Sequence, residues 1–308
     1  MANSITVANS GAFAQLISKD YKKVFFDEFK RYPELYKQVA NVTSMDSAYD
    51  REGQMTGFGA LQRLAEGQPI PSDEMLQGNN KVITPDNFGL QFQVSKNLWD
   101  DDQTGHIKKA FKELSKAAAY TRELLFWDLF NSGFVTTARV GIDSAALFAT
   151  HTLPNSYGSY SNVAGTGSSL NMTSLQAARL RFTKMVNDRA IPIPMQPKLL
   201  VIPPELEADA ERLSLTKHNP ENANMEYNWA NGLQYLVVPY LTSTTMWALV
   251  GDKADHDLRF IVREPLGWRA RTTLIRGLRS SARLCASKPT LFTGAEPTGM
   301  RGPEHGGR

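Results

Sequence analysis

Apolar residues recur at three-to-four spacing from Phe13 to Tyr36, with lysine and acidic residues between them, and this pattern predicts an amphipathic helix. Pro33 ends or interrupts that helix, because proline lacks the backbone N–H that a helix interior needs. The residues from Met1 to Gly11 are small and polar, which indicates a mobile terminal arm.

The pattern changes between Ala48 and Asn87, where glycine and proline interrupt the apolar residues. About 40 residues without a core-forming pattern is long for a connection inside a compact domain. We therefore interpret this segment either as disordered or as an extended hairpin whose partners are other subunits. Phe88–Val94 alternates apolar and polar residues, as a half-buried strand does, and is a candidate for the return arm of that hairpin.

The longest helical pattern runs from Thr104 to Asn131. Asp100–Asp102 supplies capping candidates before it, and Gly133 follows it as a glycine C-cap. About 28 residues at a rise of about 1.5 Å give a rod of about 40 Å, well above the usual helix length. We expect this helix to act as a strut across the subunit.

Leu199–Ile202 predicts a short buried strand that Pro203 ends, and Pro204 suits the first position of a helix that follows at once. An amphipathic helix over Ser174–Asp188 precedes this strand. Further strand patterns and a Gly/Pro-rich flexible tail follow, at Leu233–Leu241, Met246–Asp252, Leu258–Val262, Trp268–Ile275, Ser281–Ala286 and, for the tail, Gly294–Arg308.

Composition excludes several classes of protein. The 308 residues are 42% hydrophobic and 21% charged, as in an ordinary globular protein with one large domain or two smaller ones. A formal charge of +3 lacks the strong basic excess of a dedicated nucleic-acid binder. No apolar run approaches the roughly 20 residues that span a bilayer. The single cysteine, Cys285, cannot form an intrachain disulfide, which is typical of a reducing cytoplasm.

No motif indicates catalysis, a cofactor or a metal. The five histidines are scattered singly, and Asp100–Asp102 lacks the spacing of a calcium loop. His151, in Ala149–Pro154, is the one histidine in a setting of interest, because a Ser–His–Asp arrangement is recognised by geometry and not by sequence. There is no Gly-x-Ser-x-Gly turn to anchor such a triad, so we interpret His151 as structural.

Arginine and lysine are frequent in residues 251–288, which contain nine basic residues and four acidic ones. One interpretation is a set of solvated strand faces with weak surface ion pairs. The other is that these arginines form bidentate pairs with carboxylates of neighbouring subunits, for which the acids of the predicted hairpin are attractive partners. The residues of this inter-subunit hypothesis are Arg51, Glu52, Glu66, Asp73, Glu74, Arg263, Arg269, Arg271 and Arg276.

Three sequence segments, in this order, resemble the major capsid proteins of tailed bacteriophages, specifically the Mu-like major head subunits. They are Leu147–Asn155, Lys198–Glu207 and Trp247–Val250. The resemblance implies an α+β fold of the HK-ninety-seven-like type. The segments that it implies are an N-terminal arm (1–47), an extended loop (48–94), a peripheral domain with the spine helix (95–170), an axial domain (171–257), strands that return to the peripheral domain (258–293) and a flexible tail (294–308).

The resemblance also implies a function. Copies of the chain would self-assemble as hexamers and pentamers into an icosahedral head that encloses double-stranded DNA without sequence preference. Few residues precede Phe13, so we expect a separate scaffolding protein, with portal and decoration proteins as further partners. Assembly would take place in the host bacterial cytoplasm, with no membrane partner, no cofactor and no enzymatic activity.

Two other readings stay open. An encapsulin-like nanocompartment shell has the same fold but holds an enzyme cargo, and the long loop favours the phage capsid over it. A cytosolic hydrolase that uses His151 belongs to a different class, and particle formation would argue against it.

Overall fold

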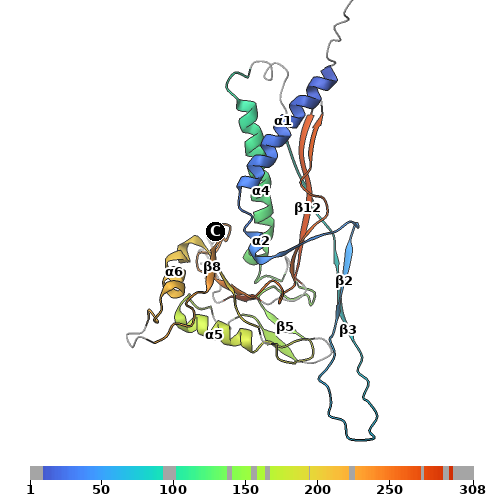
Figure 1. The fold of residues 1–308 in the computed structure, drawn as a ribbon, viewed down its shortest axis with the longest axis vertical. Coiled ribbons are helices and arrows are strands. Elements are labelled where there is room, and N and C mark those ends of the chain that lie inside the picture. Colours follow the sequence, from blue (N-terminus) through green and yellow to red (C-terminus); the bar gives the residue numbers. More distant parts are fainter. Residues whose placement is uncertain are drawn as a thin grey trace, which may run out of the picture.

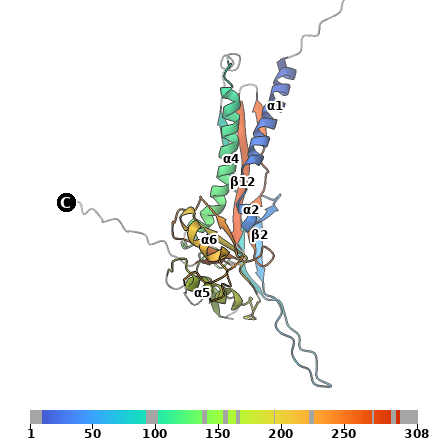
Figure 2. The ribbon, with the colours of Figure 1, turned by 60° about the vertical axis from the view of Figure 1, so that its left-hand side comes forward.

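The computed structural model describes residues 10–92, 102–136, 141–153, 158–163, 167–193, 195–221, 226–271, 274–286 and 291–293, with the backbone alone for residues 10–20, 91 and 268–293. It is an elongated molecule of mixed helix and strand (Figure 1). A long unit of helices and a ribbon-like sheet lies above a smaller unit with a second sheet, and a hairpin projects beyond both (Figures 1 and 2).

Two helices, α1 (Ser10–Arg31) and α4 (His106–Asn131), lie side by side along the long unit, as Figure 2 shows. Phe25 of α1 is buried against Leu114 and Ala118 of α4. The hydroxyl of Ser115 donates a 2.7 Å hydrogen bond to the carbonyl of Phe25, so the contact is polar as well as apolar. The helices that the apolar spacing predicts over Phe13–Tyr36 and Thr104–Asn131 are therefore both present, and α1 ends before Pro33.

The two ends of α4 are built differently from each other. At its start the N-cap residue is Gly105, and the carboxylate of Asp102 accepts hydrogen bonds from the amides of His106 and Ile107, both at 3.0 Å. Of the three aspartates expected to cap the helix, Asp102 thus satisfies two of its first amides, and Asp100 and Asp101 lie outside the described residues. At its end the predicted glycine C-cap is wrong, because Ser132 is the capping residue and Gly133 does not adopt a left-handed conformation. Gly133 instead lies against Phe148, whose ring atoms would be 2.5 Å from an added Cβ.

The long unit contains a five-stranded sheet, which we call the long sheet. Its order is β1 (Asn41–Ser44), β10 (Leu258–Val262), β12 (Leu274–Ala286) and β11 (Trp268–Arg271), with β4 (Asn87–Phe92) also paired with β12. β1 is parallel to β10, and the other pairs are antiparallel. The single strand expected over Trp268–Ile275 is wrong, because β11 ends at Arg271 and Leu274 begins its antiparallel partner β12. The strand expected at Ser281–Ala286 is the last part of the 13-residue β12.

The hairpin consists of β2 (Asp50–Met55) and β3 (Gln77–Ile83), joined by residues 56–76 without regular structure. Its antiparallel pairing supports the extended-hairpin interpretation and not the disordered one. The expected return arm was wrong, however, because β3 returns the hairpin and the strand after it, β4, pairs with β12. A half-buried alternation specifies a strand but not its partner.

The smaller unit contains a four-stranded sheet, the short sheet, with the order β13 (Leu291–Thr293), β9 (Ala248–Val250), β7 (Leu199–Ile202) and β8 (Gln234–Val237). A capped helix, α5 (Met172–Thr183), precedes β7, and a 3-10 turn at Pro204–Leu206 leads into α6 (Glu207–Leu215). A small hairpin, β5 (Thr150–Thr152) with β6 (Ser159–Ser161), lies beside them. β13 was expected among the strands of the long unit, but it pairs with β9.

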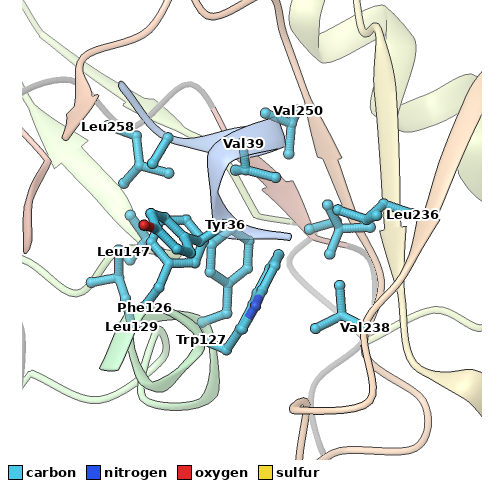
Figure 3. Packing of buried hydrophobic residues seen from close by; sticks show 14 of the residues in the cluster. Tyr36, Val39, Phe126, Trp127, Leu129, Leu147, Leu236, Val238, Val250 and Leu258 are labelled. Atoms are coloured by element: carbon cyan, nitrogen blue, oxygen red, sulfur yellow. The ribbon is translucent and has the colours of Figure 1, made fainter. Parts of the chain in front are cut away.

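The largest hydrophobic cluster joins the two units (Figure 3). Phe126 and Trp127 at the end of α4 pack with Tyr36 and Val39 of the short helix α2 (Tyr36–Val39), with strands of both sheets around them. The indole N–H of Trp127 donates a 2.7 Å hydrogen bond to Glu123, and burial raises the pKa of that carboxyl. The base of α4 is therefore the place where the two units pack against each other.

Candidate assembly surfaces

The tip of the hairpin, residues 56–76, presents apolar side chains to solvent. Leu61 is fully exposed, at 102%, and Ile70 is 83% exposed. Monomeric proteins rarely leave large apolar patches uncovered, so these exposed side chains make the tip a candidate surface for contact with another molecule. The exposed apolar side chains of β2, β3 and the tip are Met55, Phe58, Leu61, Leu64, Ile70, Met75, Leu76 and Val82.

Polar contacts at the neck of the tip hold its shape. The amide of Thr56 donates to the carbonyl of Leu76, and the amide of Leu76 donates to the hydroxyl of Thr56, both at 2.9 Å. Asp73 accepts a 2.7 Å hydrogen bond from the amide of Gly59 and lies 3.0 Å from Arg189, which together hold the pKa of Asp73 below its usual value. The tip is thus ordered at its neck while its apolar side chains face outward.

The base of the hairpin is joined to the long sheet by Arg259 of β10. Its guanidinium lies 2.6 Å from the carboxylate of Glu52 on β2 and forms a bidentate pair with Asp257, at 2.7 and 2.8 Å. Bidentate arginine–carboxylate pairs fix orientation as well as charge. The pairing of a C-terminal arginine with a hairpin acid that the sequence suggested therefore occurs, but within one subunit.

The hypothesised inter-subunit residues are spread over the hairpin and the long sheet. Glu52 and Asp73 have arginine partners in their own chain, Arg259 and Arg189. The other residues of the hypothesis that have described side chains, all of them exposed, are Arg51, Glu66, Glu74 and Arg263. The side chains of Arg269, Arg271 and Arg276 lie outside the described residues, although the backbone register places Arg269 opposite Arg276.

Sequence reasoning missed Arg189 altogether. It lies in the connection between α5 and β7, and nothing in the pattern of residues 184–198 distinguishes it from a solvated arginine. Arg259 was one of the basic residues of the C-terminal segment, but the sequence did not indicate its partners.

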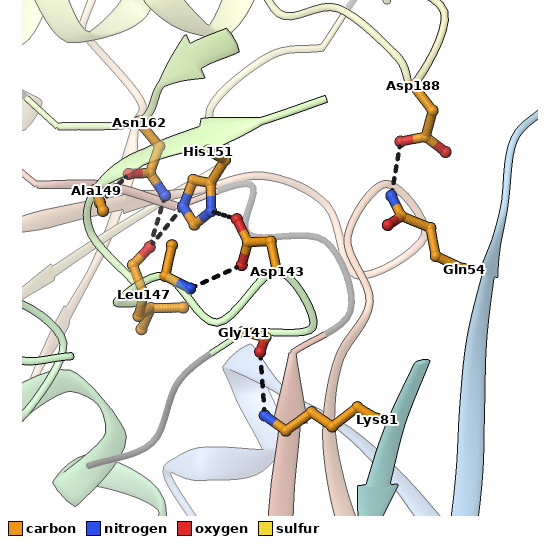
Figure 4. Close-up of polar contacts among 10 residues, drawn as sticks. Gln54, Lys81, Gly141, Asp143, Leu147, Ala149, His151, Asn162 and Asp188 are labelled. Atoms are coloured by element: carbon orange, nitrogen blue, oxygen red, sulfur yellow. Dashed lines mark hydrogen bonds and ion pairs between the residues drawn. The ribbon is translucent and has the colours of Figure 1, made fainter. Parts of the chain in front are cut away.

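His151 lies in a buried polar cluster and not in an open site (Figure 4). Its Nδ1 is 2.7 Å from Asp143 and its Nε2 is 3.3 Å from the carbonyl of Leu147, so both ring nitrogens have partners. Burial by itself would raise the pKa of Asp143, but the hydrogen bond and charge of His151 hold it below its usual value. Asn162 completes the cluster with a 2.7 Å hydrogen bond to the carbonyl of Leu147.

This geometry supports a structural role for His151. Within the described part of the chain, no serine or cysteine hydrogen bonds to the imidazole, and Asn162 and Leu147 close off its Nε2 side. The described residues also contain no group of three or more His, Cys, Asp or Glu arranged to hold a metal ion. None of the described helices is long and apolar enough to cross a membrane.

Comparison with known proteins identifies a family by sequence. The sequence profile of the family described as phage capsid protein matches residues 79–283. No curated protein matches the chain in sequence.

Solved structures share the fold at low sequence identity. The capsid of bacteriophage JBD30 is 18% identical, with a TM-score of 0.57 over 68% of this chain and 92% of that chain. The procapsid of JBD30 is 19% identical, with a TM-score of 0.54 over 76% and 100%. The holo-SrpI encapsulin complex of Synechococcus elongatus PCC 7942 is 12% identical, with a TM-score of 0.51 over 87% and 89%. The mixed helix and strand fold is thus the one that phage capsid subunits have.

Proposed function

Since this chain belongs to the phage capsid protein family and is a structural major capsid protein, we propose that its copies assemble as hexamers and pentamers into an icosahedral head that encloses double-stranded DNA. The three matching segments, Leu147–Asn155, Lys198–Glu207 and Trp247–Val250, support a place among the Mu-like major head subunits. We propose that the long unit is the peripheral domain and that the short sheet with its helices is the axial domain.

The extended hairpin is the observation that carries this proposal. A two-stranded hairpin is marginally stable in water by itself, and this one exposes Phe58, Leu61 and Ile70 at its tip. A second copy of the chain supplies the missing cover if the tip lies across it. Repetition of such a contact around a symmetry axis closes into a ring, and many modest contacts suit a shell that must correct its errors while it forms.

In this proposal only some of the charged residues of the inter-subunit hypothesis contact a neighbouring copy. Arg51, Glu66, Glu74 and Arg263 are exposed and suit contacts between copies, as do the arginines Arg269, Arg271 and Arg276. Glu52 and Asp73 act mainly within the subunit, since each already lies beside an arginine of its own chain. The small net charge of +3 suits a shell that tolerates DNA without binding it tightly.

Further partners follow from the same proposal: a separate scaffolding protein, a portal and decoration proteins, with assembly in the bacterial cytoplasm. We propose no enzymatic activity, because both nitrogens of His151 are engaged in a buried cluster.

The direct test is negative-stain electron microscopy of the purified chain, alone and after co-expression with a candidate scaffolding protein. Uniform shells, or hexamers and pentamers, are the expected result. A monodisperse monomer or dimer under both conditions would contradict the proposal.

The encapsulin-like compartment remains the second candidate, because the encapsulin complex shares the fold with a TM-score of 0.51. The contents of the particles distinguish the two. A phage head isolated from infected cells contains double-stranded DNA, whereas a nanocompartment contains a protein cargo.

A further inference from the structure

A tight turn before β7 presents one arginine toward the hairpin. The side-chain oxygen of Asn187 accepts hydrogen bonds from the backbone amides of Arg189 and Ile191, both at 2.9 Å. The backbone N–H of Asn187 donates to the carbonyl of Ile191 at 2.8 Å. Ala190 has a φ of 60°, the left-handed conformation that reverses the chain. The turn therefore fixes the backbone from which Arg189 extends.

Arg189 contacts both sides of the neck of the loop. Its Nε donates to the carbonyl of Gly57 at 2.9 Å, and one terminal nitrogen lies 3.0 Å from the carboxylate of Asp73. The other terminal nitrogen donates to the carbonyl of Glu74. Gly57 lies on the outgoing side of the tip and Asp73 and Glu74 on the returning side, so one guanidinium joins the two.

Burial indicates that this contact is part of the fold. The side chain of Arg189 is only 10% exposed although it lies against a loop whose own residues are almost all exposed. The neighbouring Asp188 accepts a 3.3 Å hydrogen bond from Gln54 of β2, as Figure 4 shows. The turn at 187–191 is thereby joined to the hairpin at two places, to β2 through Asp188 and to the neck of the tip through Arg189.

These contacts connect parts of the molecule that the chain order keeps apart. The turn belongs to the connection between α5 and β7, which are elements of the short-sheet unit, whereas β2 and β3 leave from the long unit. Arg259 holds the base of the hairpin to the long sheet, and Arg189 holds its neck to the short-sheet unit. The hairpin is therefore fixed at two points before any second copy is present.

We propose that Arg189 is a positioning residue that sets the direction in which residues 56–76 leave the subunit, so that the apolar tip is presented correctly to a second copy of the chain. This inference rests on the proposed assembly function. It states that one side chain, Arg189, orients the tip that contacts the second copy. Without Arg189 the tip keeps its apolar side chains but samples many directions. Each contact between subunits then has to fix the direction of the tip, and the conformational entropy lost in doing so weakens the contact.

The first experiment measures hydrogen exchange of unassembled subunits for Arg189→Ala, Arg189→Lys and the control Arg212→Ala. Arg212 is an exposed arginine of α6 that forms a 3.2 Å pair with Asp209 of the same helix, away from the hairpin (Figure 1). In Arg189→Ala we expect the amides of Thr56, Gly59 and Leu76 to exchange about tenfold faster or more, since charge-assisted hydrogen bonds are among the stronger ones. Lysine keeps the charge but not the fork of donors, so Arg189→Lys should lie between wild type and alanine.

The second experiment examines the particles that the same variants form. We expect wild type and Arg212→Ala to give uniform shells and Arg189→Ala to give open sheets or shells of mixed size. Asp73→Asn is a second variant that weakens the contact from the loop side, where the side chain is exposed and folding is not at risk. It should show the same two effects to a smaller degree.

Unchanged exchange at the neck would overturn the proposal, and so would faster exchange accompanied by uniform shells of wild-type size. If wild type itself forms no particles, the proposed assembly function fails. The exchange experiment then still decides whether Arg189 orders the loop, so the two failures are distinguishable.

Discussion

At the scale of single residues, the structure gives functions to side chains that the sequence makes look ordinary. Glu52 and Asp73 are two of many surface acids in composition, yet each meets a specific arginine that is distant in sequence. Gly133 stands where a glycine C-cap is expected, but its lack of a side chain instead makes room for the ring of Phe148. The added Cβ would lie 2.5 Å from the ring of Phe148, which also packs against Phe130 and Phe134.

Gly133→Ala should therefore destabilise the subunit by about 1–3 kcal/mol, the usual cost of forcing extra volume into a packed core. Urea unfolding of the unassembled chain measures it. Gly57→Ala is the matched control, because an added Cβ there meets nothing within 4 Å. Equal midpoints for the two variants would show that Phe148 moves aside at little cost.

At the scale of elements, α4 combines a start fixed by a carboxylate with an end fixed by aromatic packing. The amides of Ile107 and His106 hold the pKa of Asp102 below its ordinary value, because they stabilise the ionised carboxylate. Since the folded-state pKa is depressed, the stabilisation is present above the unfolded value near 3.8 and is lost as pH falls through the lower folded value. The start of the helix thus depends on pH only under acidic conditions.

Asp102→Ala should lower the melting temperature of the subunit at pH 7 and speed hydrogen exchange of the first turn of α4, since the amides of His106 and Ile107 lose their acceptor. The difference from wild type should shrink as pH falls below about 3.8. Gln103→Ala, an exposed neighbour in the same turn, should have little effect at any pH. A pH-independent difference would indicate that packing, and not the carboxylate charge, carries the effect.

At the scale of the whole molecule, the subunit has a packed centre and an exposed apolar tip. Its units share one hydrophobic cluster at the base of α4, while the tip of the hairpin keeps its apolar side chains in solvent. If the tip is the contact surface proposed above, stability of the subunit and assembly of the shell depend on different residues. Substitutions at the tip should separate the two properties.

Leu61→Asp and Ile70→Asp should abolish uniform shells while they change subunit stability by no more than about 0.5 kcal/mol, because both side chains are exposed before assembly. Electron microscopy and thermal unfolding measure the two properties. Ser72→Asp places the same charge at an exposed polar position of the tip and should still assemble. Normal shells from both apolar variants would mean that the tip is not the contact surface.

The helices and strands themselves were largely predictable, because they follow from the local spacing of apolar residues and from glycine and proline at their ends. The spacing of apolar residues predicts α1 and α4, and Leu199–Ile202 with its two prolines predicts β7 and the turn after it. The pairings were not. β4 pairs with β12, and β13 joins the short sheet, because an alternating pattern fits any partner with a matching apolar face.

The sequence by itself determined the order of helices and strands, the break in pattern that becomes the hairpin, and the resemblance to tailed-phage capsid proteins. Each of these depends on residues close together in the chain. The tertiary structure alone decided that Arg259 and Arg189 fix the hairpin at its base and its neck, and that His151 is enclosed by Asp143, Leu147 and Asn162. Such contacts join residues up to more than 200 positions apart, and charge or hydrogen-bonding capacity does not specify which partner the fold brings near.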